Sequence, residues 1–326
     1  MTLTQGCLLR QLGIVAREIK HWIYYFLLLP LLAVLPSRLC ELLIKKIIIR
    51  FNLKYDNLSK KQASLDNIRL VFPDDPELDR KVEQNLVYDI LLDASTCKFL
   101  FSGSVKRKKI IRIEDRKHLE HALEKGKGVI LLTGHVGSFV SSIWGLGIHG
   151  ITVSLLANDA PSSPDFSLAY RIFARITLNT VEKYCRRPVV AFPLGGDKTL
   201  ASSATRQVKS LLAANEPVIV ALDVPPYLTS SREKVRFLDR DCFMPSGLIR
   251  MAENSGSSIV TFYAAWDRPF SHECTIRFQE PFALTSDTSE NMQNCAEAIE
   301  KIIRKHPEQW FHWDAFRHFL VDNHDE

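Results

Sequence analysis

The stretch that decides the fold is GKGVILLTGH, residues 126–135. Its apolar run, residues 129–132, stands between glycines and is short, which predicts a strand buried on both faces. Strands of this kind belong to parallel sheets that helices cover on both sides. His135 follows the strand directly, at the sheet edge where open α/β folds bind their ligands. This placement makes His135 the first candidate for a catalytic residue.

Short apolar runs and helical segments alternate along most of the remaining chain. Further strands are predicted at residues 151–157, 189–193, 217–222, 258–264 and 274–278, with helices at 137–148, 165–179, 199–214, 248–255 and 289–304. Two helices, at 62–72 and 77–101, precede them. Alternation of this kind requires crossover connections and hence a mainly parallel sheet. We therefore predict one α/β domain over residues 58–326, with a mainly parallel central sheet flanked by helices.

Residues 1–57 are predicted to form an N-terminal apolar membrane-attachment helix and an amphipathic basic segment. The uncharged run WIYYFLLLPLLAVL, residues 22–35, contains Pro30 and is shorter than the roughly 18–20 residues that span a bilayer. It fits a kinked span or a half-inserted interfacial helix, and a buried core helix is the alternative. Residues 1–60 hold nine Lys and Arg but three acids, a balance that favours anionic lipid headgroups over nucleic acid.

The sequence lacks the spacing of several other kinds of site. The seven cysteines are scattered without a CxxC pair, as expected of free thiols in a reducing compartment. There is no P-loop, GxGxxG or GxSxG motif, which argues against nucleotide-dependent, dinucleotide-binding and hydrolase functions. No carboxylate or cysteine completes a metal set with His118 and His121, and His312, His318 and His324 are equally unsupported. We therefore predict no metal and no cofactor.

Five blocks of the sequence together resemble the lipid A biosynthesis (lauroyl/myristoyl) acyltransferase family of the lysophospholipid acyltransferase superfamily. In order they are ASLDNIRLVFP (63–73), GKGVILLTGHVGSF (126–139), PVIVALD (217–223), RFLDRDCFMPSGLIRMA (236–252) and PEQWFHWDAFR (307–317). Each block alone is a weak signal, but five in the same order and spacing are fairly specific. The resemblance covers roughly residues 20–320.

The resemblance implies transfer of a fatty acyl chain from acyl carrier protein or coenzyme A to a hydroxyl or amine of a membrane lipid or glycolipid. Membrane lipids and the acyl thioester would be the partners, with no nucleic acid. The implied location is the bacterial inner membrane, with the catalytic domain facing the cytoplasm. His135 would be the general base, because the acceptor hydroxyl has a pKa far above neutral. Gly137, Arg236 and Arg250 match positions near the substrate.

The sequence departs from this family pattern at Val140. The family has an acid five residues after its histidine, and valine cannot accept a hydrogen bond. Candidate replacement partners for His135 are Asp159 in the loop after the second strand, Asp223 at the end of the fourth strand, or the hydroxyl of Ser138 or Ser141. Asp223 lies at the correct edge of the sheet, although the family already has an aspartate there. A carboxylate within about 3.2 Å of His135 would favour an enzyme. Purely apolar surroundings would favour an inactive homologue that binds lipid, acyl chains or a partner enzyme, and different chemistry in the same pocket is the third possibility.

Several cations complete the set of candidate residues. The family often has an arginine before the asparagine of its next strand; Leu156 and Ala157 stand there, so Arg171 on the following helix is a candidate substitute. Arg236 and Arg250 fit either a polar or phosphate-bearing acceptor or surface ion pairs. Four consecutive cations could dock an acidic carrier protein or the membrane surface: Lys106, Arg107, Lys108 and Lys109.

Overall fold

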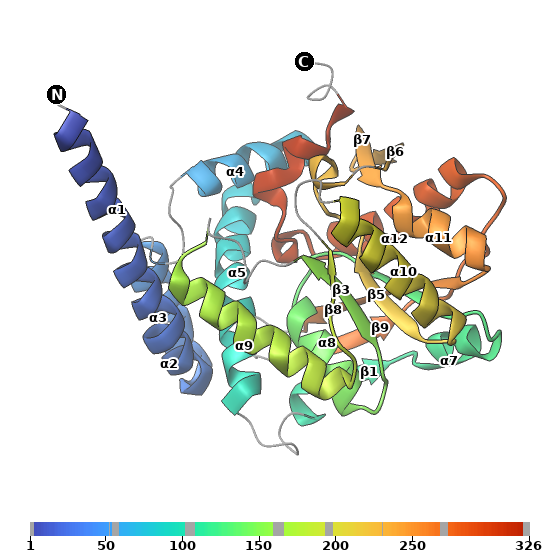
Figure 1. Cartoon of the computed structure of the whole chain (residues 1–326). Coiled ribbons are helices and arrows are strands. Elements are labelled where there is room, and N and C mark those ends of the chain that lie inside the picture. The colour runs from blue at the N-terminus through green and yellow to red at the C-terminus, as the bar shows by residue number, and fades with distance from the viewer. Residues whose placement is uncertain are drawn as a thin grey trace.

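The computed structural model describes residues 3–51, 53, 59–101, 108–158, 166–192, 198–229, 231–267 and 273–321. At its centre is a seven-stranded sheet (Figure 1). Its strand order is β1 (Ile111–Glu114), β9 (Cys274–Phe278), β8 (Ser258–Trp266), β2 (Val129–Thr133), β5 (Pro217–Ala221), β3 (Ser154–Asn158) and β4 (Val190–Phe192). The five strands from β8 to β4 are parallel, whereas β9 runs antiparallel to β8. The predicted α/β fold with a mainly parallel sheet is confirmed.

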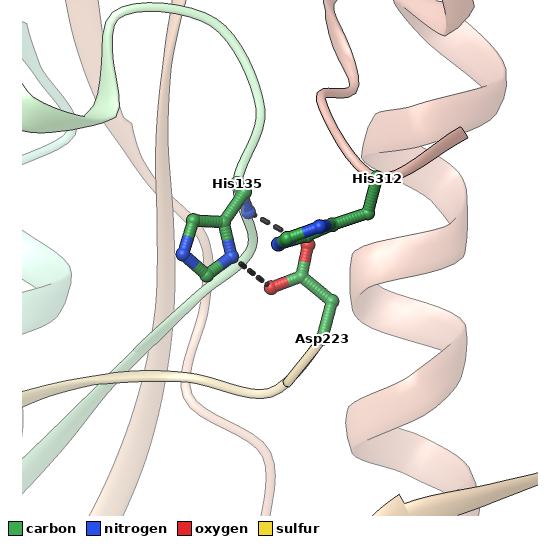
Figure 2. A group of neighbouring side chains, drawn as sticks. All are labelled: His135, Asp223 and His312. Atoms are coloured by element: carbon green, nitrogen blue, oxygen red, sulfur yellow. Dashed lines mark hydrogen bonds and ion pairs between the residues drawn. The ribbon is translucent and has the colours of Figure 1, made fainter. Parts of the chain in front are cut away.

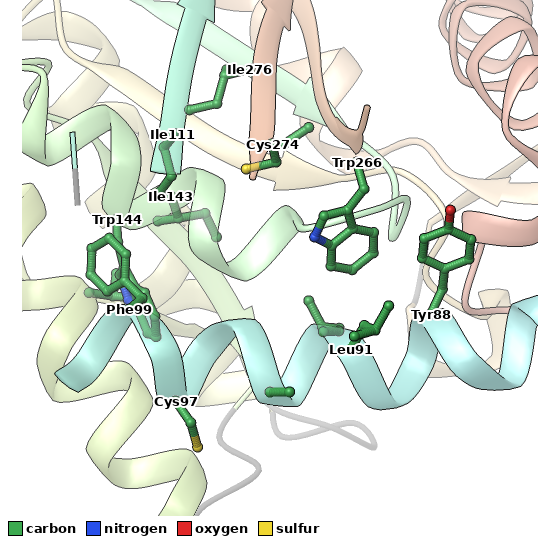
Figure 3. Close-up of a cluster of buried hydrophobic side chains, with 14 of the residues drawn as sticks. Tyr88, Leu91, Cys97, Phe99, Ile111, Ile143, Trp144, Trp266, Cys274 and Ile276 are labelled. Carbon is green, nitrogen blue, oxygen red and sulfur yellow. The ribbon is translucent and has the colours of Figure 1, made fainter. Parts of the chain in front are cut away.

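Helices pack into two apolar clusters separated by the sheet. The first cluster includes α5 (Leu78–Phe101), α7 (Lys117–Glu124), α8 (Phe139–Ile148) and α9 (Leu168–Cys185). The second includes α4 (Ser59–Val71), α10 (Lys198–Ala213), α11 (Gly247–Ser255) and α12 (Thr288–Lys305). Figure 3 shows part of the first cluster, where Phe99 of α5 packs against Trp144 of α8 with ring centroids 4.5 Å apart. Burial on both faces explains why residues 129–132 of β2 are all apolar.

A two-stranded hairpin lies outside the central sheet and was not predicted from the sequence. It consists of β6 (Arg232–Phe237) and β7 (Arg240–Pro245), paired antiparallel. Its two turn residues, Leu238 and Asp239, have φ values of +51° and +62°, the left-handed geometry that two-residue hairpin turns require. Such turns usually carry glycine or asparagine, so this segment has no hairpin signal in its sequence.

The N-terminal segment is a series of helical pieces along one side of the domain (Figure 1). They are α1 (Leu3–Ile23), the π-helical turn η1 (Tyr24–Leu28), α2 (Leu29–Val34), α3 (Ser37–Leu43) and the π-helical η2 (Ile44–Ile49). Pro30 lies where the π-helical turn η1 passes into α2, and the backbone is helical on both sides of this junction. The Tyr24 hydroxyl donates to Asp93 of α5 at 2.8 Å, and Glu18 accepts from the Leu168 amide of α9 at 2.9 Å. Among the described residues, no helix has the length and apolar character that crossing a membrane would require.

The C-terminal segment returns across the carboxyl edge of the sheet. Short 3₁₀ turns, η5 (Pro307–Gln309) and η6 (Trp313–Phe319), follow α12, and another, η4 (Pro226–Leu228), follows β5. The Asn85 side chain of α5 donates to the Trp310 carbonyl at 2.6 Å, and Asn67 of α4 donates to the Trp313 carbonyl at 2.6 Å. These bonds fix residues 307–317 over the ends of the central strands.

Candidate active site at the carboxyl edge of the sheet

The register of two adjacent parallel strands brings His135 and Asp223 together. Thr133, the last residue of β2, lies opposite Ala221, the last residue of β5. His135 and Asp223 each follow two residues later. The Nδ1 atom of His135 and the Oδ1 atom of Asp223 are 2.7 Å apart (Figure 2). A carboxylate therefore lies within the distance that was set as the test for an enzyme, and it comes from the strand rather than from the position of Val140.

Asp223 is held by three donors and is fully buried. Its Oδ2 atom accepts the His135 backbone N–H at 2.7 Å and the Trp310 indole N–H at 2.8 Å. An ionised carboxylate only accepts hydrogen bonds, so the Nδ1 atom of His135 carries the proton. The other ring nitrogen, Nε2, lies on the side away from Asp223 (Figure 2) and has a lone pair. This is the tautomer that a general base needs.

The surroundings of Asp223 keep it ionised despite its burial. Burial by itself would raise the pKa of the carboxyl group, because it disfavours the charged form. The positive potential of His135 and His312, together with hydrogen bonds from His135 and Trp310, outweighs burial and lowers this pKa below its usual range. The charge is thus available to stabilise a protonated imidazole.

Backbone hydrogen bonds to other segments hold the loop after β2 in place. Gly137 has a φ of +63°, and a Cβ atom there would come within 2.2 Å of the Ala264 carbonyl oxygen, so only glycine fits. Its N–H donates to the Gln309 carbonyl at 2.8 Å, and the Ser138 N–H donates to the Ala264 carbonyl at 2.7 Å. Both amides are used inside the fold. Gly137, expected near the substrate, therefore shapes the loop and does not offer its N–H to a substrate oxygen.

The C-terminal segment supplies two site residues that sequence reasoning missed, Trp310 and His312. The Phe311 N–H donates to the His135 carbonyl at 3.0 Å, which aligns this segment with the β2 loop. Trp310 reaches Asp223, and the His312 ring lies edge-on to the His135 ring, with centroids 4.4 Å apart. Trp310 was not among the predicted site residues, and His312 was set aside as unsupported for metal binding. Both lie in the block at residues 307–317 that carries part of the family resemblance, but the block does not show which distant residues they contact.

The remaining candidates for the partner of His135 are placed elsewhere or fall outside the described residues. Ser138 is buried, and its side chain lies beside the Cys274 thiol, so the partner of His135 is Asp223 and not this hydroxyl. Val140 packs against the first apolar cluster. Asp159 lies outside the described residues.

The predicted cations that the structure describes lie on several different elements. Arg236 on the hairpin pairs with Asp241 at 3.4 Å, and Arg250 on α11 pairs with Glu233, so the ion-pair interpretation of these two holds. Arg171 lies on α9. In the run of four cations, Lys108 and Lys109 are exposed. Lys106 and Arg107 lie outside the described residues.

The cluster can be assessed as a possible metal site as well as an acid–base site. One ligand atom from each of His135, Asp223 and His312 lies within 4.8 Å of the others. Two imidazoles and a carboxylate are a donor set that first-row transition metals accept. The structure therefore assembles, from three distant segments, the set that local spacing in the sequence failed to reveal.

A histidine oriented by a buried aspartate, at the ligand-binding edge of an α/β sheet, defines a site for general base catalysis. The sequence matches the family described as bacterial lipid A biosynthesis acyltransferase over residues 12–162 and 198–314. This match covers most of the chain, so the protein belongs to that family, whose members are acyltransferases that act on lipid. The search of curated proteins found no match.

Proposed function

We propose that the protein transfers a fatty acyl chain from a thioester to a hydroxyl or amine of a lipid or glycolipid, with His135 as the general base. The observation that carries the proposal is the 2.7 Å contact between His135 Nδ1 and the buried Asp223 carboxylate. It supplies the orienting acid that the sequence lacks at Val140. The alternative, an inactive homologue that binds lipid, acyl chains or a partner enzyme, was motivated by that missing acid, and the transfer assay described below distinguishes the two.

In the proposed reaction the Nε2 atom of His135 takes the proton of the acceptor hydroxyl as its oxygen attacks the acyl carbon. Asp223 stabilises the imidazolium that forms. The tetrahedral intermediate then collapses, the carbon–sulfur bond breaks, and the imidazolium returns the proton to the departing thiolate. The amides of His135, Gly137 and Ser138 donate within the fold. The oxyanion of the intermediate therefore takes its stabilising donors from other groups.

The proposed donor is an acyl thioester of acyl carrier protein or coenzyme A, and no further cofactor is required. Both donors are made in the cytoplasm, so we place the catalytic domain on the cytoplasmic side of the bacterial inner membrane. The cations Lys108 and Lys109 are exposed and remain candidates for contact with an acidic carrier or with anionic lipid.

The proposed membrane contact is the N-terminal segment. Most of the exposed large apolar side chains of the described residues lie there, among them Leu27, Val34, Leu42 and Phe51 at 62%, 72%, 55% and 64% exposure. Exposed large apolar side chains gathered in one segment favour an interaction site there. Basic residues of the same segment would add attraction to anionic lipids.

The membrane contact is tested by sedimentation with vesicles that contain anionic phospholipid. Leu27→Glu combined with Val34→Glu should release the protein into the supernatant. The matched control is Tyr227→Glu, which changes an exposed aromatic residue on η4. If both proteins remain with the vesicles, the N-terminal surface is not the contact.

The catalytic proposal is tested by acyl transfer with the full chain in detergent. Labelled acyl carrier protein and acyl-coenzyme A are each combined with lysolipid and glycolipid acceptors, for wild type, His135→Ala and the control His318→Ala. His318 is an exposed histidine of η6. Transfer by wild type and the control that is lost in His135→Ala supports the proposal. Equal transfer by His135→Ala would refute the role of this histidine.

A further inference from the structure

We propose that His135, Asp223 and His312 form a binding site for a divalent transition-metal ion such as Zn²⁺, and that the bound metal switches off His135 as a base. The three residues come from the loop after β2, the end of β5 and the turn between η5 and η6. Figure 2 shows the two imidazole rings and the carboxylate facing a common centre. The inference adds regulation to the proposed function, but the binding step does not depend on it.

The distances among the three ligand atoms suit a metal after a small adjustment. They lie within 4.8 Å of one another. Tetrahedral Zn²⁺ holds nitrogen and oxygen ligands at about 2.0–2.2 Å, which puts the ligands about 3.4 Å apart. The widest separation would have to shorten by up to about 1.4 Å to close the set. The His135 side chain is 25% exposed, so an ion can reach the cluster from solvent, and water can take the open coordination position.

The hydrogen bonds of Asp223 leave one oxygen for the metal. Oδ2 accepts from the His135 amide and from the Trp310 indole, and these bonds hold the carboxylate in place as outer ligands do in metal sites. Oδ1 is bonded to the Nδ1 atom of His135. A metal that inserts between Oδ1 and Nδ1 replaces one hydrogen bond and leaves the two supporting bonds intact.

Metal binding and base catalysis exclude each other on His135. A metal can bind Nδ1 only when that nitrogen has lost its proton. In the neutral ring the proton then resides on Nε2, the nitrogen that would accept the proton of the acceptor hydroxyl. The ring turns from an acceptor into a donor at the reacting side. Bound metal is therefore expected to inhibit transfer, and removal of the metal should restore it.

The binding test uses Co²⁺ as a spectroscopic probe on the full chain in detergent after treatment with a chelator. Titration should produce a visible absorption band of ligand-field origin that Zn²⁺ abolishes by competition. His312→Gln should weaken binding by more than about tenfold. His312→Phe, which keeps a ring against His135 without a nitrogen, should do the same, and the exposed-histidine control His318→Gln should match wild type.

Several results would overturn the site. These are the absence of a Co²⁺ band in wild type, an unchanged band in both His312 variants, or equal loss in His318→Gln. Thermal unfolding of each variant without metal separates lost binding from lost folding. Because absorption and melting need no turnover, a protein without transferase activity still tests the metal site. If transfer is measurable, Zn²⁺ should inhibit wild type and leave the residual activity of His312→Phe largely unaffected.

Discussion

Asp223 and Asp241 are both carboxylates in ion pairs, but their surroundings are opposite. Asp223 is fully buried and shares its two oxygens among three donors, whereas Asp241 lies on the hairpin and pairs with Arg236 and Lys234. Exposed pairs contribute little because water and salt screen them, while a buried charge that loses its partners is costly. The strand-end pair should therefore control activity, and the hairpin pair should be dispensable.

The largest effect is expected for Asp223→Asn. An asparagine keeps the shape but removes the charge that orients His135 and stabilises its protonated form, as in serine-protease triads, where the equivalent loss is about 10⁴-fold in turnover. Acyl transfer rates of variant and wild type measure it. Asp241→Asn is the matched control and should retain activity. Near-normal transfer by Asp223→Asn would place the orienting acid elsewhere.

Gly137→Ala should cause the next largest effect, on folding. The added Cβ meets the Ala264 carbonyl at a glycine-only backbone angle, and strain of this kind costs about 1–3 kcal/mol before any displacement. Denaturant unfolding should show a loss of at least about 2 kcal/mol. Gly150→Ala is the control, because its φ is also positive but nothing lies near its Cβ. A similar loss of stability in both variants would mean that the positive φ, and not the close approach to Ala264, causes the effect.

Trp310→Phe tests the third donor to Asp223. Phenylalanine keeps an aromatic ring but removes the indole N–H, and hydrogen bonds to charged groups contribute about 1.5–3 kcal/mol. Unfolding free energy should fall within that range, and transfer should fall less than in Asp223→Asn. Trp22→Phe, at an exposed position of α1, should change neither quantity. An unchanged stability of Trp310→Phe would mean that the other two donors suffice.

His306 should make the stability of the protein depend on pH. This histidine directly follows α12 and precedes residues 307–317, which lie over the site. Burial, with the nearby charges of Lys305 and Arg277, lowers the pKa of His306 to about 4 from 6.5. A depressed folded-state pKa means that its contribution is complete above about pH 6.5 and is lost as the pH falls toward 4. His306→Gln should flatten the stability curve in that interval, as measured by urea unfolding. An unchanged slope would argue against the shift.

The smallest effects are expected for Arg236→Ala and Arg250→Ala. Both guanidinium groups lie in exposed ion pairs, which typically contribute about 0.2–1 kcal/mol. Unfolding free energies should change by no more than that, and the KM for any acceptor should stay the same. A large rise in KM without a change in stability would show that these arginines contact a substrate, and that exposed ion pairs on this face are not dispensable.

The sequence by itself determined the sheet and the position of its central histidine. The buried run before His135 and the run before Asp223 are short, apolar and local, so pattern alone locates both strands. It also left Asp223 among the possible partners. The direction of β9 and the hairpin turn at Leu238 escaped prediction, because neither has a distinctive local pattern.

Tertiary structure decided which candidates meet. The register of β2 against β5 selected Asp223, and a hydrogen bond from the Ser138 N–H to the Ala264 carbonyl of β8 positioned Ser138. The returning C-terminal segment brought Trp310 and His312 to a histidine far away in the chain. Contacts of this kind depend on strand order and on hydrogen bonds such as that from Asn85 to the Trp310 carbonyl. The hydrophobic period of a sequence carries no information about them, because it specifies which side of an element is buried and not which elements become neighbours.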